Sequence, residues 1–391
     1  MIDAASGLRL LLTGLALAAL PLAAVARVRG ADHLRQLVWV TTLLTFDLLL
    51  VGVFTRLTDS GLGCPDWPGC YGAADPFAAQ APIRAAEAAL PTGPVTMTKA
   101  WIEMVHRYLA GAILVLVLVI AVQAWRTRRV RAHSPWLPTM ILLAICLQAA
   151  FGAWTVTYKL QPAFVTAHLL GGLTTFALLL WLALRMTSPH LPDTSRAHDG
   201  SAERLAGSTD RHVYRLRVLA ISALLALTAQ IALGAWVSAN YAVLACPDFP
   251  LCQGEFLPTM DFARGFTIWR ALGKTDAGAM IALPALVAIH WTHRMMAIAV
   301  FTIIAWLAAR LHAQAQFALL ARALALALLV QIATGLSNVV LQWPLALAVM
   351  HSGGAAVLLG LLVTIVFRLS PVGGVVRDRD VLPTPLRGIK T

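Results

Sequence analysis

Charged side chains are what this sequence has least of. Only 12% of the 391 residues are Asp, Glu, Lys or Arg, whereas 59% are hydrophobic. A soluble domain of ordinary composition carries about a quarter charged residues. The shortage argues against a soluble domain of this length and points to an integral membrane protein.

Cysteine is also scarce, with five residues in the chain. Cys146 lies within an apolar run, and we expect it to be a small buried packing residue. The other four, Cys64, Cys70, Cys246 and Cys252, fall in two segments between apolar runs. An oxidising compartment around those segments would permit disulfides.

Apolar runs of about 20 residues, long enough to cross a bilayer, recur along the whole chain. They predict an all-α fold, because open sheets leave backbone groups unpaired in lipid. We place nine such runs at 8–26, 37–55, 101–124, 136–156, 162–184, 217–238, 282–306, 318–340 and 344–367.

The net charge of +12 would suit a nucleic-acid partner, but its distribution excludes that interpretation. If 27–36 is cytoplasmic, the inside segments hold 20 Lys and Arg, and the outside segments between spans hold seven. Such a bias sets the orientation of a membrane protein. We therefore expect a multi-pass protein of a bacterial-type inner (cell) membrane, with both cysteine loops on the outer, periplasmic face.

The first apolar run has two interpretations. Arg9 precedes it, and it ends at 24–26 in Ala-Val-Ala, which resembles a signal-peptide cleavage site. Cleavage there would leave the three arginines of 27–35 outside, against the charge bias. We favour an extra N-terminal helix that is retained.

Two distant stretches of the chain have the same pattern. Residues 64–70 read Cys-Pro-Asp-Trp-Pro-Gly-Cys, and residues 246–252 read Cys-Pro-Asp-Phe-Pro-Leu-Cys. Gly52 and Gly234 each lie 12 residues before the first cysteine. Further matches follow in the same order: 101–107 with 288–294, and Gln148 and His168 with Gln331 and His351, each of these pairs 20 residues apart.

These matches predict a duplicated four-helix unit. Residues 37–184 form an N-terminal transmembrane bundle and 217–367 a C-terminal one, in a parallel, pseudo-symmetric repeat. Residues 1–36 supply the extra helix and a connector, 185–216 a cytoplasmic linker, and 368–391 a cytoplasmic tail.

Four histidines lie within predicted spans, about six residues from the outer end in the first half. They are His106, His168, His293 and His351. An ionisable group in a span usually faces the bundle interior. Two such histidines on parallel helices can face each other and supply both axial ligands of a haem iron. Interhelical hydrogen bonding is the plainer alternative. Zinc is less favoured, because its sites use three or four protein ligands.

The two halves differ beside the first histidine of each pair. Glu103 precedes His106 by three residues and shares its helix face, whereas His290 holds this place in the second half. A carboxyl group at such a site can act as an acid or base. The difference suggests chemistry in the first half and electron transfer in the second. Alternatively, Glu103 is solvated or pairs with Lys99 or Arg107.

Two further features belong to this region. Arg107 and Arg294 directly follow histidines, and we expect them to reach haem propionates. Each outer cysteine pair encloses five residues, two of them proline. From the residues alone, a labile disulfide beside the haem and a permanent loop staple are equally compatible with this spacing.

Several of these segments together resemble the haem A synthase family. They are residues 55–68 (Thr-Arg-Leu-Thr-Asp-Ser-Gly-Leu-Gly-Cys-Pro-Asp-Trp-Pro), residues 103–107 (Glu-Met-Val-His-Arg), His168 with its following glycines, residues 338–340 (Asn-Val-Val) and His351. The resemblance covers about 37–367, and members are usually described with eight spans, so the 8–26 helix lies outside it.

The resemblance implies an oxidoreductase that converts haem O to haem A by oxidising the methyl group on pyrrole ring D to a formyl group. The product serves terminal oxidases of the cytochrome oxidase type. Haem O would lie between His106 and His168, and a permanent haem B between His293 and His351. The carboxylate of Glu103 would be catalytic.

The resemblance also bears on the cysteines. It implies that Cys64 and Cys70 form a disulfide linked to activity in some members, and it makes Cys246–Cys252 the second disulfide. The expected partners are haem O and membrane lipid. Haem O synthase and an electron acceptor are pathway expectations, and self-association is left open.

Two other functions compete with this one. A di-haem membrane cytochrome b in quinone-linked electron transfer would hold two equivalent haem B groups. A secondary transporter would also explain a repeat, but transporters usually have broken helices at the midplane. Here the polar residues gather near the outer face.

Overall fold

The computed structural model describes residues 4–28, 32–129, 134–187, 203–275 and 278–370. Within these ranges the regular structure is helical and no strand occurs, only isolated β-bridges. Besides a 3₁₀ turn at Ala315–Phe317, the elements are α1 (Ala4–Ala26), α2 (His33–Leu57), α3 (Gln80–Ala89), α4 (Met97–Arg126), α5 (Trp136–Thr157), α6 (Pro162–Thr187), α7 (Glu203–Ala239), α8 (Phe262–Gly265), α9 (Leu283–His312), α10 (Ala318–Val340) and α11 (Leu345–Arg368).

Nine helices of the described residues are long and apolar enough to span a membrane, one for each predicted run. Their apolar surface is only partly covered by other helices, and large side chains such as Leu143 and Leu326 face outward. That arrangement suits lipid as the surrounding solvent. The all-α, multi-pass membrane class is therefore confirmed.

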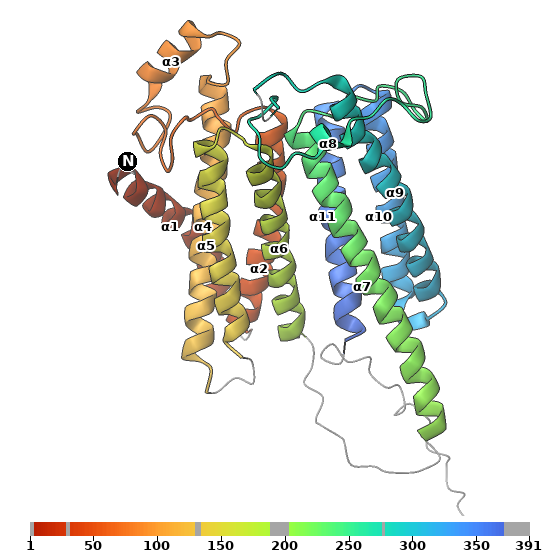
Figure 1. Ribbon diagram of the computed structural model, residues 1–391. Coiled ribbons are helices and arrows are strands. Elements are labelled where there is room, and N and C mark those ends of the chain that lie inside the picture. The colour runs from red at the N-terminus through yellow and green to blue at the C-terminus, as the bar shows by residue number, and fades with distance from the viewer. Residues whose placement is uncertain (1–3, 29–31, 130–133, 188–202, 276–277, 371–391) are drawn as a thin grey trace, which may run out of the picture.

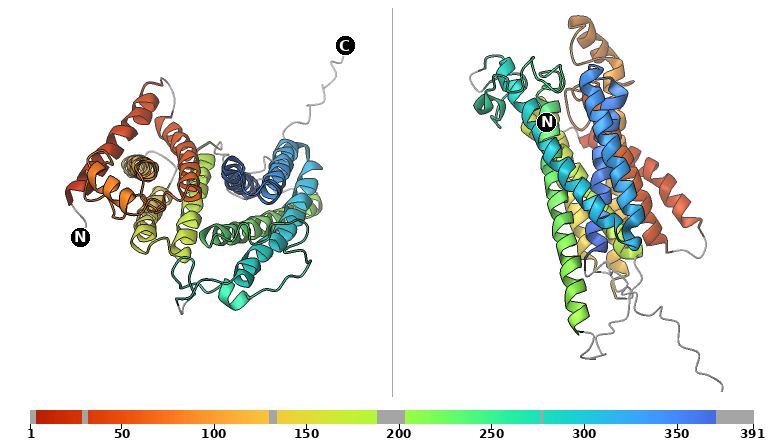
Figure 2. Two further views of the ribbon diagram at one scale, coloured as in Figure 1. Left: turned by 90° about the horizontal axis from the view of Figure 1, so that it is seen from above. Right: turned by 90° about the vertical axis from the view of Figure 1, so that its right-hand side faces the viewer.

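The spanning helices form two bundles that stand side by side (Figures 1 and 2). The first contains α2, α4, α5 and α6, and the second contains α7, α9, α10 and α11. The bundles meet where α6 packs against α7 and α11, and where α2 packs against α11. That the two bundles arose by duplication remains an interpretation of the sequence.

Each bundle has its own apolar core. Leu37, Leu116 and Leu179 belong to the first core, and Ile304 and Leu362 belong to the second. Helix α6 contributes to both, because Phe176 packs into the second core. The halves are thus structural units joined mainly along α6.

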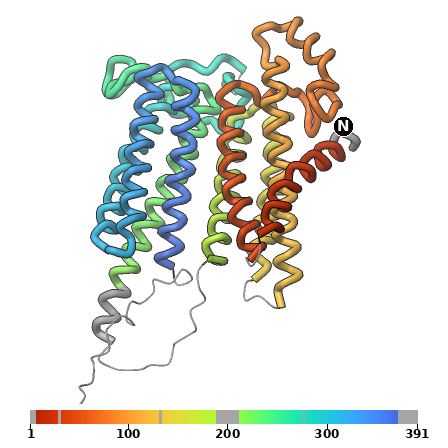
Figure 3. Tube along the Cα trace, turned by 180° about the vertical axis from the view of Figure 1, so that it is seen from behind, coloured from red at the N-terminus to blue at the C-terminus, as the bar shows by residue number. Residues whose placement is uncertain are grey.

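Helix α1 lies outside the eight-helix arrangement. It slants across the first bundle (Figure 3) and packs against α4 and, less extensively, α2. The crossing depends on glycine, since a Cβ added at Gly14 would lie 2.9 Å from the carbonyl carbon of Gly111. Retention of this helix in the cell remains a prediction.

Two sequence predictions need correction. Cys146 is exposed, not buried, because α5 turns Ile141 and Ile145 inward and leaves Cys146 on its outer side. The predicted linker 185–216 is partly helical: α6 extends to Thr187 and α7 begins at Glu203. Residues 188–202 and the end of the predicted tail, 371–391, lie outside the described residues.

Candidate functional site

The four predicted histidines lie at the same end of their bundles. In the first half, His106 follows the start of α4 by nine residues, and His168 follows the start of α6 by six. At 1.5 Å per residue these positions are roughly 13 and 9 Å from the helix starts. His106 lies further along its helix than predicted because Thr96 caps α4 earlier, accepting a hydrogen bond from Lys99 N at 3.2 Å. That the two imidazoles lie at one depth in the membrane stays a prediction.

The second half has a similar arrangement. His293 follows the start of α9 by ten residues, and His351 follows the start of α11 by six. Helix α9 begins at Leu283, with Pro284 in its first turn, where a missing N–H costs nothing. The two histidine pairs therefore have matching positions in the two bundles.

The histidine-bearing helices stand diagonally within each bundle. Helices α4 and α6 each pack against both α2 and α5, and α9 and α11 each pack against both α7 and α10. His168 is close enough to His106 for an electrostatic interaction, and His351 is likewise close to His293. Each pair therefore meets across a bundle core.

A glycine on a neighbouring helix faces each of these imidazoles. A Cβ added at the glycine would lie about 3 Å from the ring carbon between the two nitrogens. The distances are 3.0 Å from Gly52 to His106, 3.1 Å from Gly152 to His168, 3.0 Å from Gly234 to His293 and 2.8 Å from Gly335 to His351. Each ring is thus cradled by backbone, where any larger residue would displace it.

This arrangement fits a haem held by two histidines. Two imidazoles on diagonal helices can supply both axial positions of one iron. Within the ranges that the structure describes, the Nδ1 atom of His106 is buried without a hydrogen-bond partner. Buried polar atoms are normally hydrogen-bonded, so this ring is better explained as a haem ligand than as a partner in an interhelical hydrogen bond. Among the described residues, no three His, Cys, Asp or Glu side chains gather into a metal cluster.

Glu103 is buried in α4 and fully engaged. Its Oε1 accepts a hydrogen bond from Arg107 Nη2 at 2.6 Å, and its Oε2 accepts one from Cys64 N at 2.8 Å. Of the alternatives open from the sequence, pairing with Arg107 is the one observed. The carboxylate thereby ties the first cysteine loop to α4, one helical turn from His106.

Arg107 holds the first cysteine loop. Its Nη1 donates to the carbonyl oxygens of Asp66, Pro68 and Gly69 at 3.0, 3.2 and 2.5 Å. The guanidinium thus joins Glu103 to this loop, and its contact with the loop was not predicted from the sequence. Its contact with a haem propionate stays a prediction.

The second half builds the same clamp with a different partner. Arg294 donates to the carbonyl oxygens of Cys246, Asp248 and Leu251 at 2.7 to 2.9 Å. Its Nε donates to His290 Nε2 at 3.2 Å, in the place where Arg107 meets Glu103. His290, for which no role was predicted, is thus the neutral counterpart of Glu103.

Both outer cysteine pairs are bonded, Cys64 to Cys70 and Cys246 to Cys252. Inside the second loop, the carboxylate of Asp248 accepts from the N–H groups of Gln253 and Gly254, both at 2.8 Å. These bonds hold the pKa of Asp248 below its usual range, and the bond from Gly254 has the largest effect. Asp66 makes the matching bonds in the first loop.

A polar link joins the two halves, and it was not predicted from the sequence. Arg56 Nη2 donates to Ser238 O at 2.6 Å and Nη1 to the Tyr241 hydroxyl at 3.1 Å, with its guanidinium 4.4 Å from the tyrosine ring centre. The Tyr241 hydroxyl donates in turn to Asp59 at 2.5 Å. The partners are 182 to 185 residues apart in the chain, so no local pattern could reveal them.

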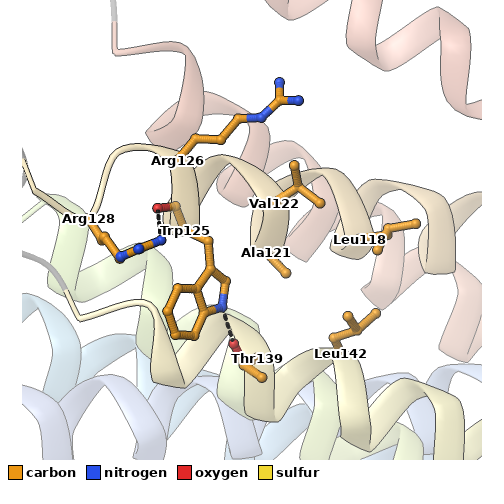
Figure 4. Close-up of a pocket in the computed structure, with 8 residues that line it drawn as sticks. All are labelled: Leu118, Ala121, Val122, Trp125, Arg126, Arg128, Thr139 and Leu142. Atoms are coloured by element: carbon orange, nitrogen blue, oxygen red, sulfur yellow. Dashed lines mark hydrogen bonds between the residues drawn. The ribbon is translucent and has the colours of Figure 1, made fainter.

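An open groove between α4 and α5 lies far from these residues. It has a volume of about 410 Å³ and lies toward the C-terminal end of α4 (Figure 4). Its lining includes Arg126 and Arg128, and Trp125 donates to Thr139 at 2.9 Å within it. None of the predicted site residues lines it.

Fold and site together define a class: a multi-pass helical membrane protein in which each of two bundles presents a histidine pair suited to haem. Comparison with known proteins narrows this class. A family model described as cytochrome oxidase assembly protein matches residues 35–363.

Similar proteins include several named haem A synthase. The one from Shewanella oneidensis is 39% identical over 333 residues, covering 84% of this chain and 96% of that protein. The one from Caulobacter is 29% identical over 354 residues, covering 85% and 94%. The chain belongs to the haem A synthase family of cytochrome oxidase assembly proteins, whose members are membrane oxidoreductases, and the resemblance found in its sequence is confirmed.

Proposed function

We propose that this chain oxidises the ring-D methyl group of haem O to a formyl group, giving haem A for cytochrome oxidase. The observation that carries the proposal is an asymmetry between two otherwise matching sites. Both have a diagonal histidine pair, but only the first has a carboxylate, Glu103, one turn from its histidine. A site for chemistry and a site for a permanent cofactor would differ in this way.

Substrate and cofactor are assigned to different halves. Haem O as substrate lies between His106 and His168, and haem B is held by His293 and His351. Haem B, when bound, supplies one-electron redox chemistry. Converting the methyl group to a formyl group with oxygen from water releases four protons and four electrons, and the electrons pass to a separate acceptor in the membrane.

Glu103 is the residue we assign to proton handling in the first half. Paired with Arg107 and held by Cys64 N, it is kept in one orientation beside His106. A positioned carboxylate can take up a proton released at the methyl carbon. Cys64 and Cys70, linked to the same carboxylate through Cys64 N, set the position of the loop over the site.

The test is expression in a bacterium that makes haem O but lacks haem A synthase, followed by haem extraction and chromatography. The wild type should yield haem A and haem B. His106→Ala and His168→Ala should lose haem A and keep haem B, whereas His293→Ala and His351→Ala should lose haem B. Two equivalents of haem B, with no haem O or haem A, would instead favour a di-haem cytochrome b.

The proposed orientation places both cysteine loops on the periplasmic face of the bacterial inner membrane. The excess of Lys and Arg in the opposite segments supports it. Alkaline phosphatase inserted after Gly93 should be active, and the same insertion within 188–202 should be inactive. The reverse pattern would overturn the orientation without touching the reaction. The reaction itself requires haem O and an electron acceptor, and haem O synthase as a partner is an expectation from the pathway alone.

A further inference from the structure

Three of the four paired histidines contact a glutamine from a neighbouring helix. In each case the glutamine lies four residues before the glycine that cradles the ring. Gln148 Nε2 is 3.0 Å from His168 Nδ1, and Gln230 Nε2 is 3.1 Å from His293 Nδ1. Gln331 Nε2 is 3.5 Å from His351 Nε2, at the limit of a hydrogen bond.

The same three glutamines have unused acceptors. The Oε1 atoms of Gln148, Gln230 and Gln331 are all buried without a hydrogen-bond partner. Turning an amide by half a rotation exchanges its oxygen and nitrogen. Turned in this way, Gln148 and Gln230 give up the bonds that their Nε2 atoms donate to the carbonyl oxygens of His168 and His293, and accept from the Nδ1–H of these histidines instead. His351 Nδ1 needs no such turn, because it lies 3.2 Å from two acceptors, the Gln331 carbonyl oxygen and Thr334 Oγ1.

The fourth histidine is the exception. Four residues before Gly52, in the place of the glutamine, α2 carries Leu48, which packs into the first apolar core. His106 Nδ1 is buried and has no hydrogen-bond partner within the described part of the chain. Of the four imidazoles, His106 is thus the one whose cradle offers neither a donor nor an acceptor.

A hydrogen bond to the outer nitrogen of a metal-bound histidine fixes the ring and makes it a stronger ligand, and losing that bond typically costs about 10- to 100-fold in metal affinity. We infer that Leu48 makes His106 the weakest of the four axial ligands. The haem of the first half can then be exchanged, while the Gln230 side chain and the Gln331 carbonyl oxygen, as acceptors for the outer nitrogens of His293 and His351, retain that of the second half. This inference rests on the proposed function and assigns Leu48 and the three glutamines as positioning residues.

The experiment compares Leu48→Gln with Leu48→Met in the purified full-length protein. Apomyoglobin in excess captures dissociating haem, and extraction identifies which haem is lost. In the wild type, haem O or haem A should leave before haem B. Leu48→Gln should slow the loss of haem O or haem A from the first half by about 10- to 100-fold. It should also lower the reduction potential of the iron in that half, because a more basic imidazole favours the ferric state. Leu48→Met, which adds no acceptor, should behave as the wild type.

A second variant keeps the inference testable if Leu48→Gln does not fold. Gln230→Leu should hasten loss of haem B by about 10- to 100-fold and leave the release of haem O or haem A unchanged. Equal dissociation from both sites in the wild type, or no response to either substitution, would overturn the inference while the proposed function stands. A protein that binds no haem would overturn both.

Discussion

Glu103 and Arg107 show how one helical turn serves both the loop and the site. The arginine holds three loop carbonyls, and the carboxylate neutralises the arginine and accepts from Cys64 N. Both side chains are buried, at 4% and 8% exposure. Removing one partner of such a pair leaves an uncompensated charge, at a cost of about 3–5 kcal/mol. An alanine substitution of Glu103 would therefore lower both stability and activity, and the two effects could not be separated.

The second half supplies a better control, because His290 partners Arg294 in the equivalent place. We predict that Glu103→His preserves folding and haem content but abolishes formyl product, since the arginine keeps a partner and the carboxylate is lost. Haem extraction measures both the haem content and the formyl product. Glu103→Ala should lose stability as well as product. Normal haem A yield from Glu103→His would remove Glu103 from the chemistry.

Asp248 gives a prediction that depends on pH. Its pKa is lowered by the bonds from Gly254 N and Gln253 N, so it stabilises its loop above the ordinary aspartate pKa, and this contribution is lost as the pH falls through the lowered value. At pH 7, Asp248→Ala should open the loop and speed reduction of the buried Cys246–Cys252 bond by a phosphine several-fold. In strong acid the wild type and the variant should react alike.

The matched control for this experiment is Asp261→Ala, which removes the cap of α8 outside the disulfide loop. It should leave the rate of reduction unchanged at neutral pH. An Asp248→Ala difference that persists undiminished in acid would contradict the assigned role of the carboxylate.

At the scale of the element, the crossing of α1 and α4 depends on one glycine. We predict opposite effects of the same substitution at two sites. Gly7→Ala places its Cβ 3.7 Å from Pro68 and should lower hydrogen exchange in α1, because alanine favours helix by about 1 kcal/mol. Gly14→Ala meets the backbone of Gly111 at 2.9 Å and should raise exchange in α1. Lowered exchange in both variants would mean that α1 does not pack on α4.

The elements themselves were largely predictable. Apolar runs predicted all nine spanning helices, because span length is a local property of composition. The largest differences are at α7, which starts 14 residues before the predicted run, and at α9, which ends six residues after it; the other ends agree to within four residues. The exposure of Cys146 was not predictable, since composition does not say which side of a helix faces its neighbours.

The site was predictable only in part. The four histidines and Glu103 were found from the repeat, but Gln230, Leu48 and the partner of His290 were not. Their roles depend on contacts between helices, as with Gln230 and His293, which are 63 residues apart. The one signal of these contacts in the sequence is the spacing of glutamine four residues before glycine, which occurs three times.

At the scale of the whole molecule, the separate cores predict that each half tolerates loss of the other's haem. His351→Ala should remove haem B and leave haem O bound in the first half, because α4 and α6 keep their packing against α2 and α5. Haem extraction and the thermal unfolding midpoint measure the outcome. Loss of both haems from this variant would show that the halves bind haem as one unit.

The polar link between the halves is best tested as a pair. Arg56→Met removes the bonds to Ser238 O and Tyr241 and the ion pair with Asp59, and Tyr241→Phe removes the hydroxyl that is bonded to both Arg56 and Asp59. Because Arg56 is only 15% exposed, the link should be stronger than an open surface pair, which contributes up to about 1 kcal/mol. Each substitution should lower the midpoint of thermal unfolding. The double variant should fall below Arg56→Met, because the bond from Tyr241 to Asp59 survives in that variant, but by less than the sum of the two single shifts, since both substitutions remove the same Arg56–Tyr241 contact. Shifts that simply add would mean that Arg56 and Tyr241 act separately, and that the halves are held together by the packing of α6 against α7 and α11.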